Sequence, residues 1–108
     1  MTIENDINQD EKIIVKVDSD LEELIPGFLK DWQKETKNMQ ESLEKNDYDT
    51  IRKMGHNMKG TGGACGFNDI TDMGGKLESA AKDMDPDVIR ETLGALSSYL
   101  EHVEVVYE

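Results

Sequence analysis

The apolar residues of this chain recur in steps of three and four along most of its length. From residue 25 to about residue 45 this spacing marks one face of a helix of about five turns. Pro26 suits the first turn of that helix. Asn46 tolerates a left-handed helix end, and Asp47 can cap the helix that follows. The predicted inward stripe comprises Ile25, Leu29, Trp32, Thr36, Met39 and Leu43.

Three further segments follow the same period. The second helix is predicted from Tyr48 to Cys65, with Gly66 at its end, and the third starts at a cap formed by Asn68 or Asp69. The last helix follows Asp85-Pro86, and its stripe continues to Val106. Only a few residues separate successive helices, so neighbours are expected to run in opposite directions. The pattern predicts an all-α fold, an antiparallel up-down four-helix bundle. The three stripes comprise Tyr48, Ile51, Gly55, Met58 and Gly62; Ile70, Met73, Leu77, Ala80 and Met84; and Ile89, Thr92 or Leu93, Leu96, Leu100, Val103 and Val106.

The N-terminal part of the chain departs from this period. Residues 1–12 are polar and acidic, which predicts a frayed tail, and residues 13–108 are expected to form a single domain. Residues 13–17 look like a strand, but the only other strand-like run is 103–106, and an isolated pair of strands is marginal. We therefore expect 13–17 to be an extended lead-in that packs on the helices. Ser19 and Glu22 form a capping box that predicts a short extra helix through Leu24.

Composition narrows the classes of function. The chain is 36% hydrophobic and 33% charged, and no apolar run approaches the roughly 20 residues of a membrane span. Its net charge of −12 argues against binding nucleic acid or an anionic membrane. The single cysteine, Cys65, cannot form an internal disulfide, which favours a cytoplasmic location. Two histidines and one cysteine do not supply the three or four converging ligands of a metal site, and no phosphate-binding loop precedes a helix, so we expect no metal and no cofactor.

The predicted second helix contains an unusual glycine run, with four glycines in the seven positions 60–66. Glycine costs a helix interior about 1 kcal/mol relative to alanine, so the run needs another reason. On a helical wheel Gly55 and Gly62 face the bundle, which predicts close packing on the helix that carries Gly74 and Gly75. Other residues gather within about 40° of His56 on the solvated flank, where missing side chains give a large partner access. These are Arg52, His56, Lys59, Gly60 and Gly63.

His56 and Lys59 together suit phosphoryl transfer. A neutral imidazole is a good nucleophile near pH 7, and a lysine one helical turn later can neutralise phosphoryl oxygens. An exposed histidine without a functional role is common. The presence of Lys59 and the outward glycines next to His56 favours a functional role for it.

These residues resemble the histidine phosphotransfer (HPt) family. The resemblance rests on His56-x-x-Lys59-Gly60, on Gly66-Phe67 at the end of that helix and on Leu77-Glu78 in the next. It extends over about residues 18–106 and includes the segments 26–29 and 47–48. Such a resemblance implies a four-helix bundle with the phosphorylated histidine midway along it. It also implies a phosphoryl carrier, without an active site of its own, in a two-component phosphorelay.

Carried over to this chain, the resemblance implies that His56 accepts the phosphoryl group on Nε2. Lys59 matches the lysine near that group, and Gly60 matches the small residue that permits close docking. Glu78 matches a position that orients the histidine through Nδ1 in some members, and an ordinary solvated glutamate remains an open alternative. The implied partners are response-regulator receiver domains, which supply an aspartate and Mg²⁺, and a hybrid histidine kinase is a further candidate. The docking surface would comprise Arg52, His56, Lys59, Gly60 and Gly63 on a monomer.

A second hypothesis is a non-phosphorylated module that binds and sequesters a receiver domain through the same face. Loss of His56 or Lys59 would have favoured it, and both are present. The variant His56→Ala separates the two, because a sequestering module would keep both its affinity and its biological effect.

Overall fold

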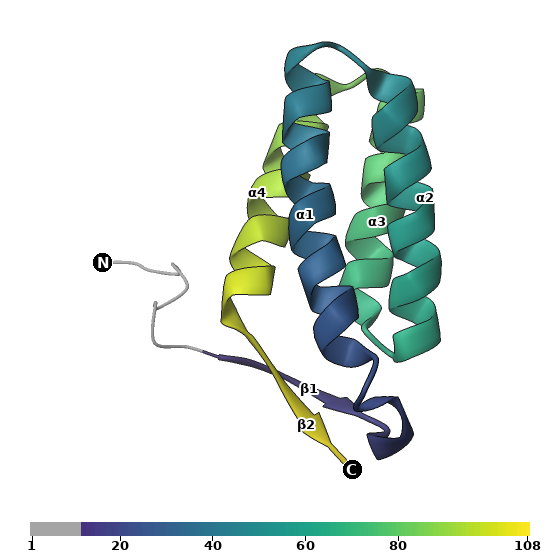
Figure 1. Cartoon of the computed structure of the whole chain (residues 1–108). Coiled ribbons are helices and arrows are strands. Elements are labelled where there is room, and N and C mark those ends of the chain that lie inside the picture. The colour runs from purple at the N-terminus through teal and green to yellow at the C-terminus, as the bar shows by residue number, and fades with distance from the viewer. Residues whose placement is uncertain (1–11) are drawn as a thin grey trace, which may run out of the picture.

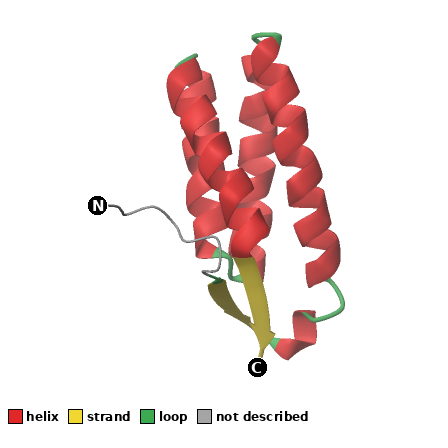
Figure 2. Ribbon diagram, turned by 90° about the vertical axis from the view of Figure 1, so that its left-hand side faces the viewer, coloured by secondary structure: helices red, strands yellow, loops and turns green. Residues whose placement is uncertain are grey.

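The computed structural model describes residues 12–108 and consists mostly of four helices that lie side by side (Figure 1). They are α1 (Ile25–Glu44), α2 (Tyr48–Cys65), α3 (Asn68–Lys82) and α4 (Pro86–His102). Two short strands, β1 (Ile13–Val17) and β2 (Val103–Tyr107), lie at the end of the bundle opposite the α1–α2 loop (Figures 1 and 2). The four-helix architecture predicted from the apolar spacing is confirmed. The predicted tail over residues 1–12 falls, except for Lys12, outside the described residues.

The helix boundaries follow from capping chemistry. Asp47 accepts a hydrogen bond from the Thr50 amide at 3.2 Å, and Asp85 accepts one from the Val88 amide at 3.3 Å. The Thr50 amide and hydroxyl both donate to Asp47, which lowers the pKa of its carboxyl group. Gly66 ends α2 in the left-handed conformation, at φ 81°. The predicted bounds of α2 are therefore confirmed at both ends.

The prediction for residues 13–17 was wrong. This segment is a strand, and β1 pairs in parallel with β2 in a register from Ile13 opposite Val103 to Val17 opposite Tyr107. The last helix accordingly ends at His102, not at Val106. Local periodicity could not decide this, because Val103 and Val106 satisfy a helical step of three as well as an extended strand. The bundle makes the pair stable by burying the inner side chains of both strands, among them Val17, at 3% exposure.

The expected short α-helix before α1 is also corrected. Residues Ser19–Leu21 form a single 3₁₀ turn, and Asp18, not Ser19, caps it by accepting from the Asp20 amide at 2.9 Å. At the start of α3 the cap position is Phe67, which has no side-chain cap, so the predicted Asn68 or Asp69 cap was wrong. The ring of Phe67 is fully buried, so its packing holds the start of α3 in place and no polar side chain is needed as a cap.

Met84 was wrongly assigned to the inward stripe of α3. It lies beyond the helix, at φ 51°, and its side chain is 66% exposed. The helix ends at Lys82, before the period reaches this residue.

Helices α2 and α3 lie unusually close because glycines face one another. A Cβ atom added to Gly74 would lie 2.6 Å from the Lys59 amide nitrogen, and one added to Gly55 would lie 2.8 Å from the Glu78 amide nitrogen. Gly55 lies opposite Glu78, and Lys59, further along α2, lies opposite the earlier residue Gly74 of α3, so these two helices run in opposite directions. This confirms the predicted close packing at Gly55 and Gly74. Gly75 contributes less, because its added Cβ would only touch the Lys59 side chain at 3.7 Å.

A buried tryptophan ties α1 to the helix that carries His56. The Trp32 indole nitrogen donates to the Thr61 hydroxyl at 3.1 Å. Its ring stacks on Phe28, with 5.9 Å between centroids, and meets Phe67 edge-on at 5.1 Å. The contact holds α2 at a fixed position against α1, one turn beyond the histidine.

The buried hydroxyl of Tyr99 leads us to predict a loss of folding stability at high pH. Its hydroxyl is buried and has no hydrogen-bond partner among residues 12–108, and burial, together with the nearby Asp69 carboxylate, raises the pKa of Tyr99 to about 12. An unfolded chain loses this proton near pH 10, so folding stability from this group is complete below about pH 10 and is lost as the pH rises through 12. In urea unfolding, wild type should lose more stability than Tyr99→Phe between pH 9 and pH 11.5, by on the order of 2 kcal/mol. Parallel curves for the two proteins would contradict the assignment.

Candidate functional site

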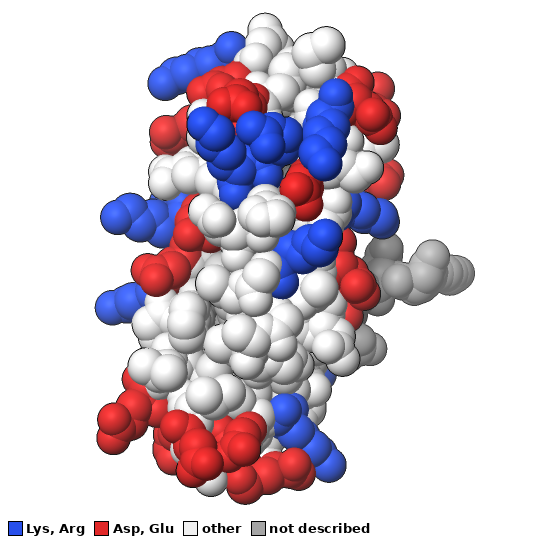
Figure 3. Space-filling model, turned by 90° about the vertical axis from the view of Figure 1, so that its right-hand side faces the viewer, with Lys and Arg blue, Asp and Glu red and all other residues white. Residues whose placement is uncertain are grey.

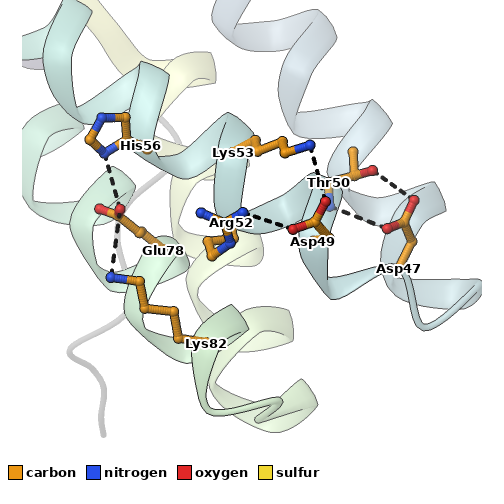
Figure 4. Close-up of polar contacts among 8 residues, drawn as sticks. All are labelled: Asp47, Asp49, Thr50, Arg52, Lys53, His56, Glu78 and Lys82. Carbon is orange, nitrogen blue, oxygen red and sulfur yellow. Dashed lines mark hydrogen bonds and ion pairs between the residues drawn. The ribbon is translucent and has the colours of Figure 1, made fainter.

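His56 lies on the outer side of α2 with its imidazole largely in solvent. The ring is 67% exposed, and Nδ1 lies 3.0 Å from Oε2 of Glu78 on α3. Figure 4 shows the other ring nitrogen, Nε2, pointing away from the carboxylate. A carboxylate is an acceptor only, so this contact places the proton of a neutral ring on Nδ1 and leaves the lone pair of Nε2 free. The sequence left open whether Glu78 meets His56, and the structure brings them together.

Glu78 is itself held among basic groups. Its side chain is only 14% exposed, and its oxygens lie 3.9 Å from Nζ of Lys59 and 4.0 Å from Nζ of Lys82. Both ammonium groups remain more than half exposed, so each pair contributes little to stability. Two positive side chains therefore lie beside the carboxylate that contacts His56, and Figure 4 shows the one from Lys82.

Lys82 is the member of this cluster that sequence reasoning missed. It lies one helical turn after Glu78, at the i,i+4 spacing that brings opposite charges together on one face of a helix. That spacing is visible in the sequence and was a usable signal.

The Lys59 side chain crosses the surface of α3 to reach the cluster. The stem of its side chain passes over Gly75, where a Cβ atom would lie 3.7 Å from Cδ of the lysine. Its ammonium group is therefore on the same side of α2 as His56, as predicted, and it is near the carboxylate that holds the ring.

The outward glycines leave the surface near His56 open. A Cβ atom on Gly60 would meet nothing within 4 Å, and one on Gly63 would touch only the Thr71 hydroxyl at 3.6 Å. Neither residue needs to be glycine for the packing of its own chain. This distinguishes them from Gly55 and Gly62, which are buried against α3.

Arg52 lies near His56 along the helix but makes its contacts elsewhere. Its guanidinium donates to Asp49 at 2.8 Å, and Lys53 contacts the same carboxylate at 3.1 Å (Figure 4). Hydrogen bonds from Arg52 and Lys53 lower the pKa of Asp49. The structure does not bring Arg52 into the cluster around His56.

The face formed by α2 and α3 carries a group of basic side chains, although the protein has a net charge of −12. Lys and Arg side chains gather on its upper part, and a broad area without charged side chains lies beside them (Figure 3). Acidic side chains lie next to these basic groups and along both edges of this view, and they gather again at the far end of the molecule. This face therefore combines a group of basic side chains, with acidic ones beside them, and an uncharged surface next to it.

The remaining reactive side chains do not join this site. Nδ1 of His102 lies 2.7 Å from the Ser98 carbonyl oxygen, and Cys65 is buried, which raises the pKa of its thiol. Within residues 12–108 no group of three or more His, Cys, Asp or Glu side chains is placed to hold a metal ion. No helix in the described part of the chain is long and apolar enough to cross a membrane.

Comparison with known proteins agrees with this geometry. The family model of the Hpt domain matches residues 23–105, a range that includes all four helices. No curated protein and no solved structure gave a match. The chain belongs to the Hpt domain family, whose members carry phosphoryl groups on histidine in two-component signalling.

Proposed function

We propose that this protein is a phosphoryl carrier of a phosphorelay and that His56 is its phospho-acceptor. The observation that carries the proposal is the 3.0 Å contact between Nδ1 and Glu78, because it leaves Nε2 as an exposed nucleophile. The donor is the phosphorylated aspartate of a receiver domain, and a second receiver domain is the acceptor. A hybrid histidine kinase is one protein that can carry such a donor.

The transfer step follows from the positions of the protons. The Nε2 lone pair attacks phosphorus, the bond from phosphorus to the aspartate oxygen breaks, and the aspartate leaves as a carboxylate. The ring then carries a positive charge with its proton still on Nδ1, and Glu78 stabilises that charge at hydrogen-bond distance. The receiver domain supplies the aspartate and its Mg²⁺, so this chain contributes the nucleophile and its surroundings.

Lys59 supplies the compensating positive charge. Its ammonium lies 3.9 Å from Glu78 on an exposed, flexible side chain, so it can turn from that carboxylate toward a phosphoryl group on Nε2. When His56 is phosphorylated, the Lys59 ammonium thus exchanges the Glu78 carboxylate for the phosphoryl oxygens.

The docking surface is proposed to centre on His56, Lys59, Gly60 and Gly63, with Arg52 at its edge. The two glycines present open backbone, which lets a receiver domain approach the imidazole closely. The protein is expected to act as a monomer, in the cytoplasm.

The direct test uses a receiver domain phosphorylated on its aspartate and the full chain. Transfer should produce a 1:1 phosphorylated species by mass spectrometry, and its phosphorus–nitrogen bond should be labile in acid and stable in base. An adduct with the opposite behaviour, or no transfer from any receiver domain of the source organism, would refute the proposal.

Glu78 is expected to act as a positioning residue. The variant Glu78→Ala should slow transfer about tenfold, by analogy with the 10–100-fold cost of removing a group that orients a metal-ligating histidine. Glu78→Gln, which keeps an acceptor for Nδ1–H, should retain more of the rate. Nitrogen-15 NMR of the imidazole should show less of the Nδ1–H tautomer in Glu78→Ala, a change that a purely structural role would not produce. An unchanged tautomer ratio would count against this role.

A further inference from the structure

Among residues 12–108, no strand pairs with the outer edge of β1 in the sheet at the end of the bundle. The Glu108 amide donates to the Val17 carbonyl, and the Ser19 amide donates to the Glu108 carbonyl, both at 3.0 Å. Odd-numbered residues of β1 therefore bond to β2, and the amides and carbonyls of Ile14 and Lys16 point the other way. Within residues 12–108 these outward groups have no backbone partner. Such an edge is a template for another strand.

This edge opens into a groove beside α3 and α4, which we call the β1 groove. Its first part has a volume of about 500 Å³ and runs between the Ile14–Lys16 edge and Asn68, Asp69 and Tyr99. The second part, of about 290 Å³, is lined by Ile13, Met73 and Ala95 and by the same Asp69 and Tyr99. Asp69 and Tyr99 line both parts, so the two parts lie next to each other.

Two features indicate the chemistry of an occupant. Tyr99 lines both parts of the groove, and its buried hydroxyl lacks a hydrogen-bond partner among the described residues, which is costly for a buried polar group. Asp69 and Asp72 place two exposed carboxylates along the same wall, and the side chains of Met73 and Ala95 between α3 and α4 are apolar. An occupant would thus meet backbone donors and acceptors, an apolar pocket and negative charge.

We propose that the β1 groove binds an extended segment of a partner protein, which adds a strand to the free edge of β1. Its backbone pairs with Ile14 and Lys16. One side chain that faces the bundle is apolar and enters the pocket at Met73 and Ala95, and another, two residues along, is a lysine or arginine that meets Asp69 and Asp72. Backbone pairing gives such an interaction its affinity, and the alternate side chains give it specificity.

This surface is separate from the phosphotransfer site. Strand β1, which forms one side of the β1 groove, lies at one end of the bundle (Figures 1 and 2). His56 lies midway along α2, and its side chain is exposed to solvent. Binding here could hold the carrier beside a partner without covering the imidazole.

The test uses the full chain and four fluorescein-labelled peptides, Gly-Ser-Xaa-Thr-Xaa-Thr-Arg-Thr-Gly with both Xaa positions Val, Ile, Leu or Phe. At least one should bind saturably with a Kd on the order of 10⁻⁴ M, and replacement of its arginine by glutamate should weaken binding about tenfold. Failure of all four to bind, or equal binding of the glutamate peptide, would overturn the proposal.

A matched pair of variants locates the binding site. Ile14→Pro removes an amide that points out of the sheet at β1, whereas Val105→Pro removes one at the opposite free edge, on β2. Ile14→Pro should weaken binding at least tenfold and Val105→Pro should leave it unchanged. Circular dichroism checks that each variant is folded, and a peptide that binds both proline variants equally well would place the site elsewhere.

Hydrogen exchange gives a second readout that does not depend on folding of a variant. The amides of Ile14 and Lys16 should exchange rapidly in the free protein and become protected when peptide is added. If they are already protected in dilute free protein, the edge is occupied by this chain or by a second copy of it, and the proposal is wrong.

Discussion

The variant His56→Gln is expected to lose nearly all phosphoryl transfer from a phosphorylated receiver domain. Glutamine keeps a polar side chain of similar reach at an exposed position of α2, so the fold should be unaffected. It has no nitrogen lone pair that can attack phosphorus, because the amide nitrogen is delocalised into the carbonyl. Initial transfer rates, measured by loss of label from the receiver and gain on this chain, should fall about 100-fold or more.

The matched control is His102→Gln, which changes the other histidine. That residue contacts the Ser98 carbonyl and lies away from the cluster around Glu78, so transfer should proceed at the wild-type rate. Full labelling of His56→Gln would mean that the phospho-acceptor is another residue. Receiver binding that persists together with its biological effect in His56→Ala would favour the sequestering module.

The largest effect on stability is expected from Gly74→Ala. A Cβ atom at this position would lie 2.6 Å from the Lys59 amide nitrogen and 2.8 Å from the Gly55 carbonyl oxygen, both of which belong to the backbone of α2. Since backbone atoms cannot rotate away, α2 and α3 must separate. Such overpacking costs about 1–3 kcal/mol or more, and the helix preference of alanine returns at most about 1 kcal/mol. We expect a net loss of about 2 kcal/mol and a Tm lower by roughly 10 °C.

Gly60→Ala is the control for helix preference, since it makes the same change where an added Cβ would meet no atom within 4 Å. It should raise the free energy of unfolding by up to about 1 kcal/mol. Differential scanning calorimetry measures the Tm of each variant relative to wild type. Equal Tm values would show that the helices absorb the extra methyl group, and the close approach would then not be needed for stability. A separation of α2 from α3 should also slow phosphotransfer in Gly74→Ala, because it moves Glu78 away from His56.

Local chemistry accounts for what could be predicted about the helices. Asp47, Gly66 and Asp85 define helix ends through hydrogen bonds and backbone conformations that involve only a few neighbouring residues. The same is true of the two faces of α2, because the helical period by itself assigns Gly55 to the bundle and His56 to the solvent. Predictions failed where a partner distant in sequence decides the outcome. Val103 and Val106 fit a helical stripe, and only the presence of β1 alongside makes their segment a strand.

The candidate site also has some features that follow from one helix alone and others that depend on distant residues. The sequence by itself determined that His56 and Lys59 share the solvated side of one helix and that the glycines around them divide between two faces. Only the tertiary structure decided that Glu78 reaches Nδ1, because that contact depends on how closely α3 approaches α2 and on the rotation of each helix about its axis. The approach is set by Gly55 and Gly74, whose missing side chains allow the two backbones to meet. The β1 groove likewise exists only in the folded chain, since its walls come from β1, α3 and α4, and no local period in the sequence links these three segments.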